Sequence, residues 1–144
     1  MVRQLCLIVL LTQWSTAALL AQTPGSATTV SMAQASDLWQ AGQYPKALKV
    51  YDELVKVDSL RVAALTMRGE LKFLDMGKHE EGFADVQEAV NLDPTSFLAL
   101  TTRGDMYISL GMPDRALTDA GVALGIAKNG GDSSKVRLIA GLAY

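Results

Sequence analysis

The sequence has very little of what metal and thiol chemistry require. Its only cysteine, Cys6, lies near the start of the chain, and its only histidine is His79. A protein metal site needs three or four converging ligands, so a lone histidine beside a turn indicates a surface residue. Without a histidine partner, a serine nucleophile has no base to activate it. We therefore expect no metal, no cofactor and no enzymatic activity.

An excess of positive charge is missing as well. The 144 residues include 13 Lys and Arg against 15 Asp and Glu, which gives a formal net charge of −2. Basic residues do not cluster with aromatic ones, the pattern that contacts phosphate backbones. Nucleic acid is therefore not an expected partner. The acidic residues show no pairing pattern, and we interpret them as solvated helix faces.

A long hydrophobic run occurs once, close to the N-terminus. Arg3 precedes an unbroken apolar run over residues 5–11, and small residues follow it. That order is typical of a secretory signal. We predict a signal peptide over 1–21, cleaved after Ala21, and hence an exported protein that is periplasmic, in a secretory lumen or secreted. The alternative is an uncleaved membrane anchor, although the apolar run is shorter than the roughly 20 residues that span a bilayer.

One phrase of the sequence returns. Residues 65–73 are LTMRGELKF and residues 100–108 are LTTRGDMYI, an offset of 35 residues. Three glycines, spaced 35 and then 34 residues apart, mark one turn in each copy: Gly42, Gly77 and Gly111. Beyond each glycine, small and apolar residues recur at steps of four, three and three, which draws one stripe along a helix. A helix, a glycine turn and a second helix about every 34 residues form a structural repeat.

These residues resemble the tetratricopeptide repeat family. Its signature is a small residue in the first helix, a glycine at the turn, then alanine, an aromatic, alanine and a closing proline. The matching residues here include Ala35, Gly69, Gly104, Ala47, Tyr51, Ala89, Pro94, Tyr107, Ala116 and Ala123. The resemblance implies an all-α fold, a right-handed α-solenoid of three helix-turn-helix repeats.

The expected organisation has a linker, three repeats and a final helix. A flexible linker over 22–28 leads into repeats over 29–127, at about 28–61, 62–96 and 97–130. We predict a C-terminal helix over 131–144, because Val136, Ile139 and Leu142 recur every three residues on one apolar face. This helix is either a cap or the first helix of a partial fourth repeat.

Several positions depart from the family pattern. The first-helix tryptophan is replaced by Ser31, Leu65 and Leu100. Arg68 and Arg103 stand where the family usually buries leucine. Gly82 replaces an alanine whose methyl group normally packs between the helices, a change that costs roughly 1 kcal/mol inside a helix. We therefore expect the second repeat to be the less stable one.

In this family the first helices line a concave surface that holds the ligand. The positions expected to face inward are spaced four and then three residues apart and form three ladders: Met32, Thr66 and Thr101; Ser36, Glu70 and Asp105; Trp39, Phe73 and Ile108. Such a groove is apolar on one side and acidic on the other, which favours a neutral-apolar or basic segment of a partner protein. The alternative is that the third ladder packs against neighbouring helices as core.

Some members of the family hold chaperone tails by a clamp of Lys, Asn and Arg on a terminal carboxylate. The matching positions here carry no cation: Met32, Ser36, Met67, Leu98 and Thr102. We therefore predict a protein-interaction scaffold or adaptor that binds a different kind of peptide. The alternative is a structural subunit of a larger solenoid or a homo-oligomer, with self-association through the C-terminal helix.

Overall fold

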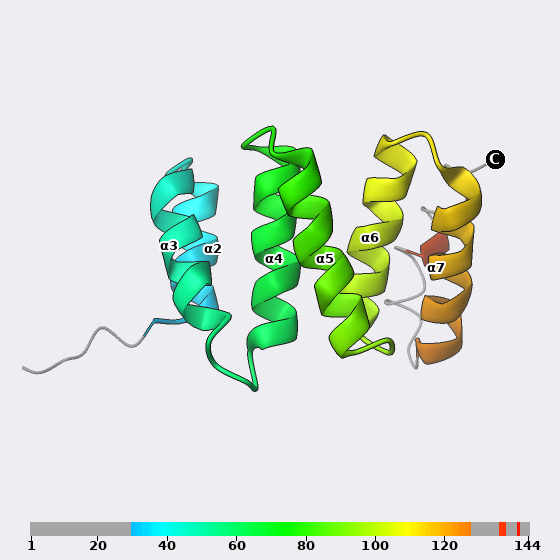
Figure 1. The fold of residues 1–144 in the computed structure, drawn as a ribbon, viewed down its shortest axis with the longest axis horizontal. Coiled ribbons are helices and arrows are strands. Elements are labelled where there is room, and N and C mark those ends of the chain that lie inside the picture. The colour runs from blue at the N-terminus through cyan, green and yellow to red at the C-terminus, as the bar shows by residue number, and fades with distance from the viewer. Residues whose placement is uncertain (1–29, 128–135, 138–140, 142–144) are drawn as a thin grey trace, which may run out of the picture.

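The computed structural model describes residues 30–127 together with 136, 137 and 141. Throughout these residues the regular elements are helices: α2 (Met32–Gln40), α3 (Tyr44–Leu54), α4 (Arg61–Leu74), α5 (His79–Leu92), α6 (Phe97–Ser109) and α7 (Pro113–Ile126). They follow one another in a single row of helix pairs, α2 with α3, α4 with α5 and α6 with α7 (Figure 1). The predicted all-α solenoid is confirmed.

Both ends of the chain are described only in part. The predicted signal peptide over 1–21 and the linker over 22–28 lie outside the described residues, so export stays a prediction. Of the predicted C-terminal helix over 131–144, residues 136, 137 and 141 are helical. Val136 is fully buried in the core between α6 and α7. None of the helices formed by the described residues has the length and apolar character needed to cross a bilayer.

Local sequence signals set the helix ends. The turn glycines adopt left-handed backbone angles, with φ of 71° at Gly42, 66° at Gly77 and 70° at Gly111. Pro45 and Pro113 lie in the first turns of α3 and α7, where the missing amide hydrogen costs nothing. The hydroxyl groups of Ser31 and Ser96 accept hydrogen bonds from backbone amides and cap α2 and α6.

Gly82 lies where the backbones of α4 and α5 come closest. A Cβ atom added to Gly82 would lie 2.5 Å from the carbonyl oxygen of Gly69 and 2.7 Å from the amide nitrogen of Phe73. A Cβ atom added to Gly69 would lie 2.6 Å from the carbonyl oxygen of Gly82. The missing methyl group is therefore not a gap, because backbone atoms fill its place. Glycine is less favourable than alanine inside a helix, but only glycine lets the two backbones come this close.

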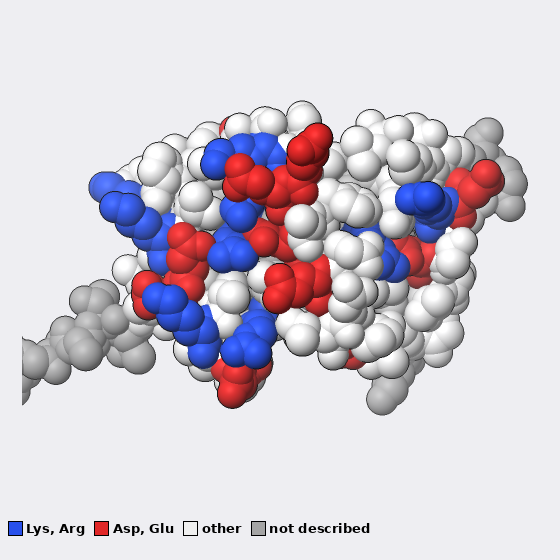
Figure 2. All heavy atoms as spheres, in the orientation of Figure 1, with Lys and Arg blue, Asp and Glu red and all other residues white. Residues whose placement is uncertain are grey.

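Charge is distributed unevenly over the solenoid. On the face that Figure 2 shows, Lys and Arg are interleaved with Asp and Glu over α3, α4 and α5, whereas charged side chains are sparser over α6 and α7. Several apolar side chains of α7 and of the turn between α6 and α7 are exposed, among them Leu110, Met112, Val122 and Leu124.

Candidate functional site

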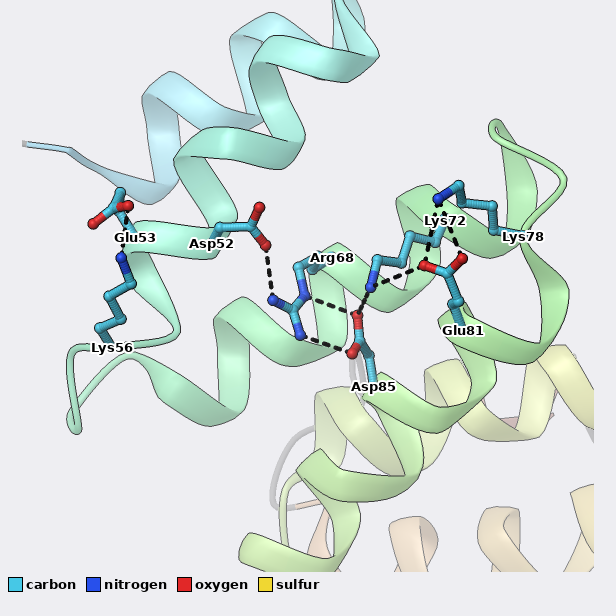
Figure 3. Close-up of polar contacts among 8 residues, drawn as sticks. All are labelled: Asp52, Glu53, Lys56, Arg68, Lys72, Lys78, Glu81 and Asp85. Atoms are coloured by element: carbon cyan, nitrogen blue, oxygen red, sulfur yellow. Dashed lines mark hydrogen bonds and ion pairs between the residues drawn. The ribbon is translucent and has the colours of Figure 1, made fainter.

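An arginine with only 17% of its side chain exposed joins three helices in the second repeat. Arg68 of α4 donates two parallel hydrogen bonds to Asp85 of α5, from Nε to Oδ2 and from Nη2 to Oδ1, both 2.8 Å long. Its Nη1 donates to Asp52 of α3 at 2.8 Å, so the guanidinium lies between the two carboxylates (Figure 3). Lys72 adds a second cation to Asp85 at 2.9 Å. These contacts fix the rotation of α4 about its own axis.

The third repeat has the same arrangement. Arg103 of α6 donates to both carboxylate oxygens of Asp119 on α7, at 2.8 and 2.6 Å. Its Nη1 donates to Gln87 of α5 at 3.1 Å. Gln87 holds the place that Asp52 has one repeat earlier. The arginines at the positions where the family buries leucine are thus paired across helices.

The interpretation of the acidic residues as solvated faces is wrong for Asp85 and Asp119. These two residues are 7% and 4% exposed. Burial by itself would lower the pKa of Arg68, but the hydrogen bonds that it donates to Asp85 and Asp52 outweigh this effect and raise that pKa. The bond with Asp119 likewise raises the pKa of Arg103 against the effect of burial. Both guanidinium groups are held in the charged form.

The arginine contacts orient the acidic residues two positions further along the chain. Successive residues of an α-helix are rotated by about 100°, so Glu70 projects from α4 about 200° away from Arg68. Since Arg68 faces α3 and α5, Glu70 faces the opposite side of α4. Arg103 and Asp105 stand in the same relation on α6. The recurring phrase therefore supplies an arginine that faces the neighbouring second helices, a glycine for close packing, and an acidic residue on the opposite side of the first helix.

The far sides of α4 and α6 enclose a pocket with about 300 Å³ of open space. Seven residues line it: Glu70, Phe73, Leu74, Thr102, Asp105, Met106 and Ser109. Phe73, Thr102 and Met106 are almost fully buried and form its floor, and Leu74 is an exposed part of its rim. Three predicted site residues, Glu70, Phe73 and Asp105, are brought together here. Sequence reasoning named Thr102 only as a position of the chaperone-tail clamp, and it missed Met106 as a site residue.

Two buried hydroxyl groups have no hydrogen-bond partner among the described residues: that of Thr102 in the pocket and that of Tyr51 in the core of the first repeat. Burial raises the pKa of Tyr51, and the negative charge of Glu70 raises it further. The field of Glu70 therefore extends into the core of the first repeat. Ser109 is already engaged, because its hydroxyl donates to the backbone carbonyl of Asp105 at 3.0 Å.

Thr66 and Thr101 offer no surface to a ligand. They are 0% and 1% exposed. The hydroxyl of Thr66 donates to the carbonyl of Val62 at 2.7 Å, and that of Thr101 donates to the carbonyl of Phe97 at 3.0 Å. A threonine hydroxyl that bonds one turn back along its own helix can be buried without an unpaired polar group. We therefore leave both threonines out of the candidate site.

The remaining predicted residues lie away from the pocket and are partly buried. Met32, Ser36 and Trp39 belong to α2, and the indole Nε1 of Trp39 donates to Asp75 at 2.7 Å. Met32 and Trp39 pack against the core of the first repeat, and Ile108 packs against that of the third. The sequence left open whether the third ladder packs as core. Trp39 and Ile108 do pack against the core, although both are only partly buried. Phe73 is both core and pocket floor.

A second hollow, with about 530 Å³ of open space, lies where α5, α6 and α7 meet near their turns. Its lining is His79, Glu80, Phe83, Tyr107, Leu110, Met112 and Arg115. The exposed His79 contacts the ring of Phe73 edge to face at 4.8 Å between centroids. The described residues include no group of His, Cys, Asp and Glu placed to hold a metal ion. Sequence reasoning missed this hollow because it considered only the first helices, whereas α5 and α7 supply much of this lining.

No protein-family model matches the chain, and no curated protein shows significant similarity to it. Solved structures do resemble it. PcrH from Pseudomonas aeruginosa is 16% identical with a TM-score of 0.68, over 83% of this chain and 94% of that one. The TPR2B domain of yeast Sti1, in its pHsp70 complex, is 19% identical with a TM-score of 0.67, over 76% and 89% of the two chains.

The second TPR domain of human RPAP3, in complex with an HSP70 peptide, is 22% identical with a TM-score of 0.58. This match covers 74% of the present chain and 88% of the RPAP3 domain. At such low identities the likeness concerns the fold alone. Together with the helix pairs and glycine turns described above, it shows that this chain has the tetratricopeptide repeat fold.

Proposed function

We propose that the protein is an exported interaction adaptor whose first helices, α2, α4 and α6, hold a segment of another protein. The observation that carries this proposal is the pocket that unites Glu70, Phe73 and Asp105 from two successive repeats. Its floor is apolar and its rim is acidic, so it suits a basic or neutral-apolar segment. Binding, rather than catalysis, is the activity that this arrangement supports.

A chaperone tail is not the partner that we propose. Two of the similar solved structures contain pHsp70 or an HSP70 peptide. The positions that would grip a terminal carboxylate carry no cation in this chain: Met32, Ser36, Met67, Leu98 and Thr102. Glu70 and Asp105 would repel such a carboxylate.

Capture of a partner from the exported or envelope fraction tests the proposal. Glu70→Lys combined with Asp105→Lys should abolish capture, because the acidic rim becomes basic. Helicity should stay nearly unchanged and the melting temperature should fall only slightly, because both carboxylates are half-buried rather than core groups and ion pairs near the surface contribute roughly 0 to 1 kcal/mol each.

The matched control is Glu53→Lys with Glu88→Lys, which makes the same change in net charge on the exposed faces of α3 and α5. This control should capture the partner as the original chain does. Equal capture by the folded groove variant and the control would exclude the concave site.

A second candidate function, a subunit of a larger solenoid or a homo-oligomer, is favoured by the surface of α7. Val122 and Leu124 are 45% and 44% exposed. Cβ atoms added to Gly121 and Gly125 would meet no atom of the described residues within 4 Å, so those residues leave this face uncovered. Light scattering over a range of concentrations discriminates: a stable monomer supports the adaptor, and a concentration-dependent oligomer supports the subunit.

A further inference from the structure

We infer that the pocket between α4 and α6 binds the side chain of a lysine in the partner segment. This inference rests on the proposed function and names the chemical group that the site selects. It follows from three features of the pocket: the number and kind of its acceptors, its apolar walls, and the absence of a lysine or arginine from its described lining.

The pocket offers three acceptors at different positions. Glu70 comes from α4, and Asp105 and Thr102 come from α6. The Thr102 side chain is 2% exposed, and its hydroxyl makes no hydrogen bond within the described part of the chain. A lysine ammonium has three rotatable N–H donors, one for each acceptor. A carboxylate has about four lone-pair sites, so each acid can accept this donor in addition to other bonds.

The walls suit the stem of a lysine. Phe73 and Met106 form an apolar floor, and Leu74, with 60% of its surface exposed, extends it towards solvent. Lysine buries its methylene chain along apolar surface while its charged end keeps polar contacts. The cavity itself has a volume of about 70 Å³, far below the roughly 300–1,000 Å³ of small-molecule pockets, so the site suits a single side chain.

The cations nearest in sequence do not compete for the pocket. Arg68 and Lys72 are both bonded to Asp85, on the side of α4 that faces α5. Charge is thus segregated across α4, with the cations held towards α5 and the carboxylate of Glu70 in the pocket. Arginine fits less well than lysine, because its planar guanidinium is bulkier than a compact ammonium and the cavity is small.

The test uses the full chain with labelled methionine and threonine methyl groups, observed by NMR. Three peptides of seven residues, acetylated and amidated, have leucine on both sides of a central lysine, norleucine or arginine. We expect the lysine peptide to shift the methyl signals of Met106 and Thr102. It should bind roughly tenfold more tightly than the norleucine peptide, the size expected for a charged hydrogen-bonded contact, and more tightly than the arginine peptide.

Variants of the pocket locate the selectivity. Glu70→Gln with Asp105→Asn should bring the ratio of lysine to norleucine affinity close to one, whereas Glu53→Gln with Glu88→Gln, the control of equal charge, should preserve it. Thr102→Val should lower the ratio without lowering the melting temperature, because the hydroxyl it removes is unpaired.

Equal binding of the lysine and norleucine peptides, or a ratio that survives the double pocket variant, would overturn the lysine site and leave the groove intact. Absence of methyl shifts with all three peptides also overturns it. The capture experiment with the lysine variants of Glu70 and Asp105 decides the proposed function separately.

Discussion

The second and third repeats meet the same packing requirement with different residues. Both contain an arginine that pairs with an aspartate across the helix pair. In the second repeat the two helices touch through Gly69 and Gly82, whereas in the third Ala116 stands in the place of Gly82. The comparison shows that the arginine-aspartate pair is the constant element and that the backbone spacing is adjusted around it.

The difference continues one turn along the first helix. Lys72 in α4 bonds Asp85, and the equivalent position in α6 is Tyr107. The Tyr107 ring packs edge to face on Phe83 with 5.2 Å between centroids, and the guanidinium of Arg103 lies 5.8 Å from its centroid. The second repeat is thus held by a network of several charges, whereas the third combines the Arg103–Asp119 ion pair with aromatic packing.

The largest expected effect comes from removing the buried aspartates one at a time. Asp119→Asn leaves Arg103 facing only neutral partners among the described residues, and removing one member of a buried pair costs about 3–5 kcal/mol. Asp85→Asn should cost less, about 1–3 kcal/mol, because Asp52 still bonds Arg68 and Glu81 lies 3.8 Å from Lys72. Urea unfolding of the two variants measures the difference.

Asp58→Asn serves as the control for these two variants. Asp58 pairs with Arg61 on the surface and its side chain is 89% exposed, so the loss should stay below about 1 kcal/mol. If Asp85→Asn proved as costly as Asp119→Asn, the remaining carboxylates of the second repeat would not compensate for the lost one. The two repeats would then depend equally on a single pair.

The next effect concerns the backbone contact between Gly69 and Gly82 in the second repeat. Gly82→Ala should destabilise the protein by about 1–3 kcal/mol, since the added methyl group overlaps backbone atoms of α4. Gly121→Ala is the matched control, because its methyl group would enter open space in the middle of α7. That control should gain up to about 1 kcal/mol from helix propensity. Thermal melting of both variants decides whether Gly82 is a defect or a requirement.

Periodicity was sufficient to predict the fold. The stripe of small and apolar residues gave the helix pairs, and the turn glycines and the prolines of the first turns gave the ends of the helices. It could not predict the burial of Asp85 or Asp119, because a helical stripe treats every charge as solvent-facing. The sequence did contain a signal for these pairs. Arg68 and Arg103 recur 35 residues apart, and Asp85 and Asp119 recur 34 residues apart, close to the period of the repeat.

The candidate site was predicted in part for a similar reason. Helix spacing placed Glu70, Phe73 and Asp105 on one side of the first helices, and the structure joins them in one pocket. Helix spacing also placed Thr66 and Thr101 there, although their hydroxyl groups bond their own helices and the side chains are buried. Whether a polar residue is buried depends on its hydrogen-bond partner, which the spacing of residues does not reveal.

The smallest expected effect tests how the first repeat differs from the others at one position. Tyr51 stands where the later repeats have Val86 and Ala120, and its buried hydroxyl is unpaired. Burial, and then the charge of Glu70, raise its pKa above the ordinary value of 10.0. The unfolded chain therefore loses this proton first as the pH rises, so this contribution to stability is complete below pH 10 and is lost above it.

Tyr51→Phe should change the free energy of unfolding by no more than about 1 kcal/mol at pH 7 and should become the more stable form in alkaline solution. Urea unfolding at pH 7 and above pH 10 measures this crossover, and parallel pH profiles for the two proteins would show that the Tyr51 hydroxyl is not shielded from water.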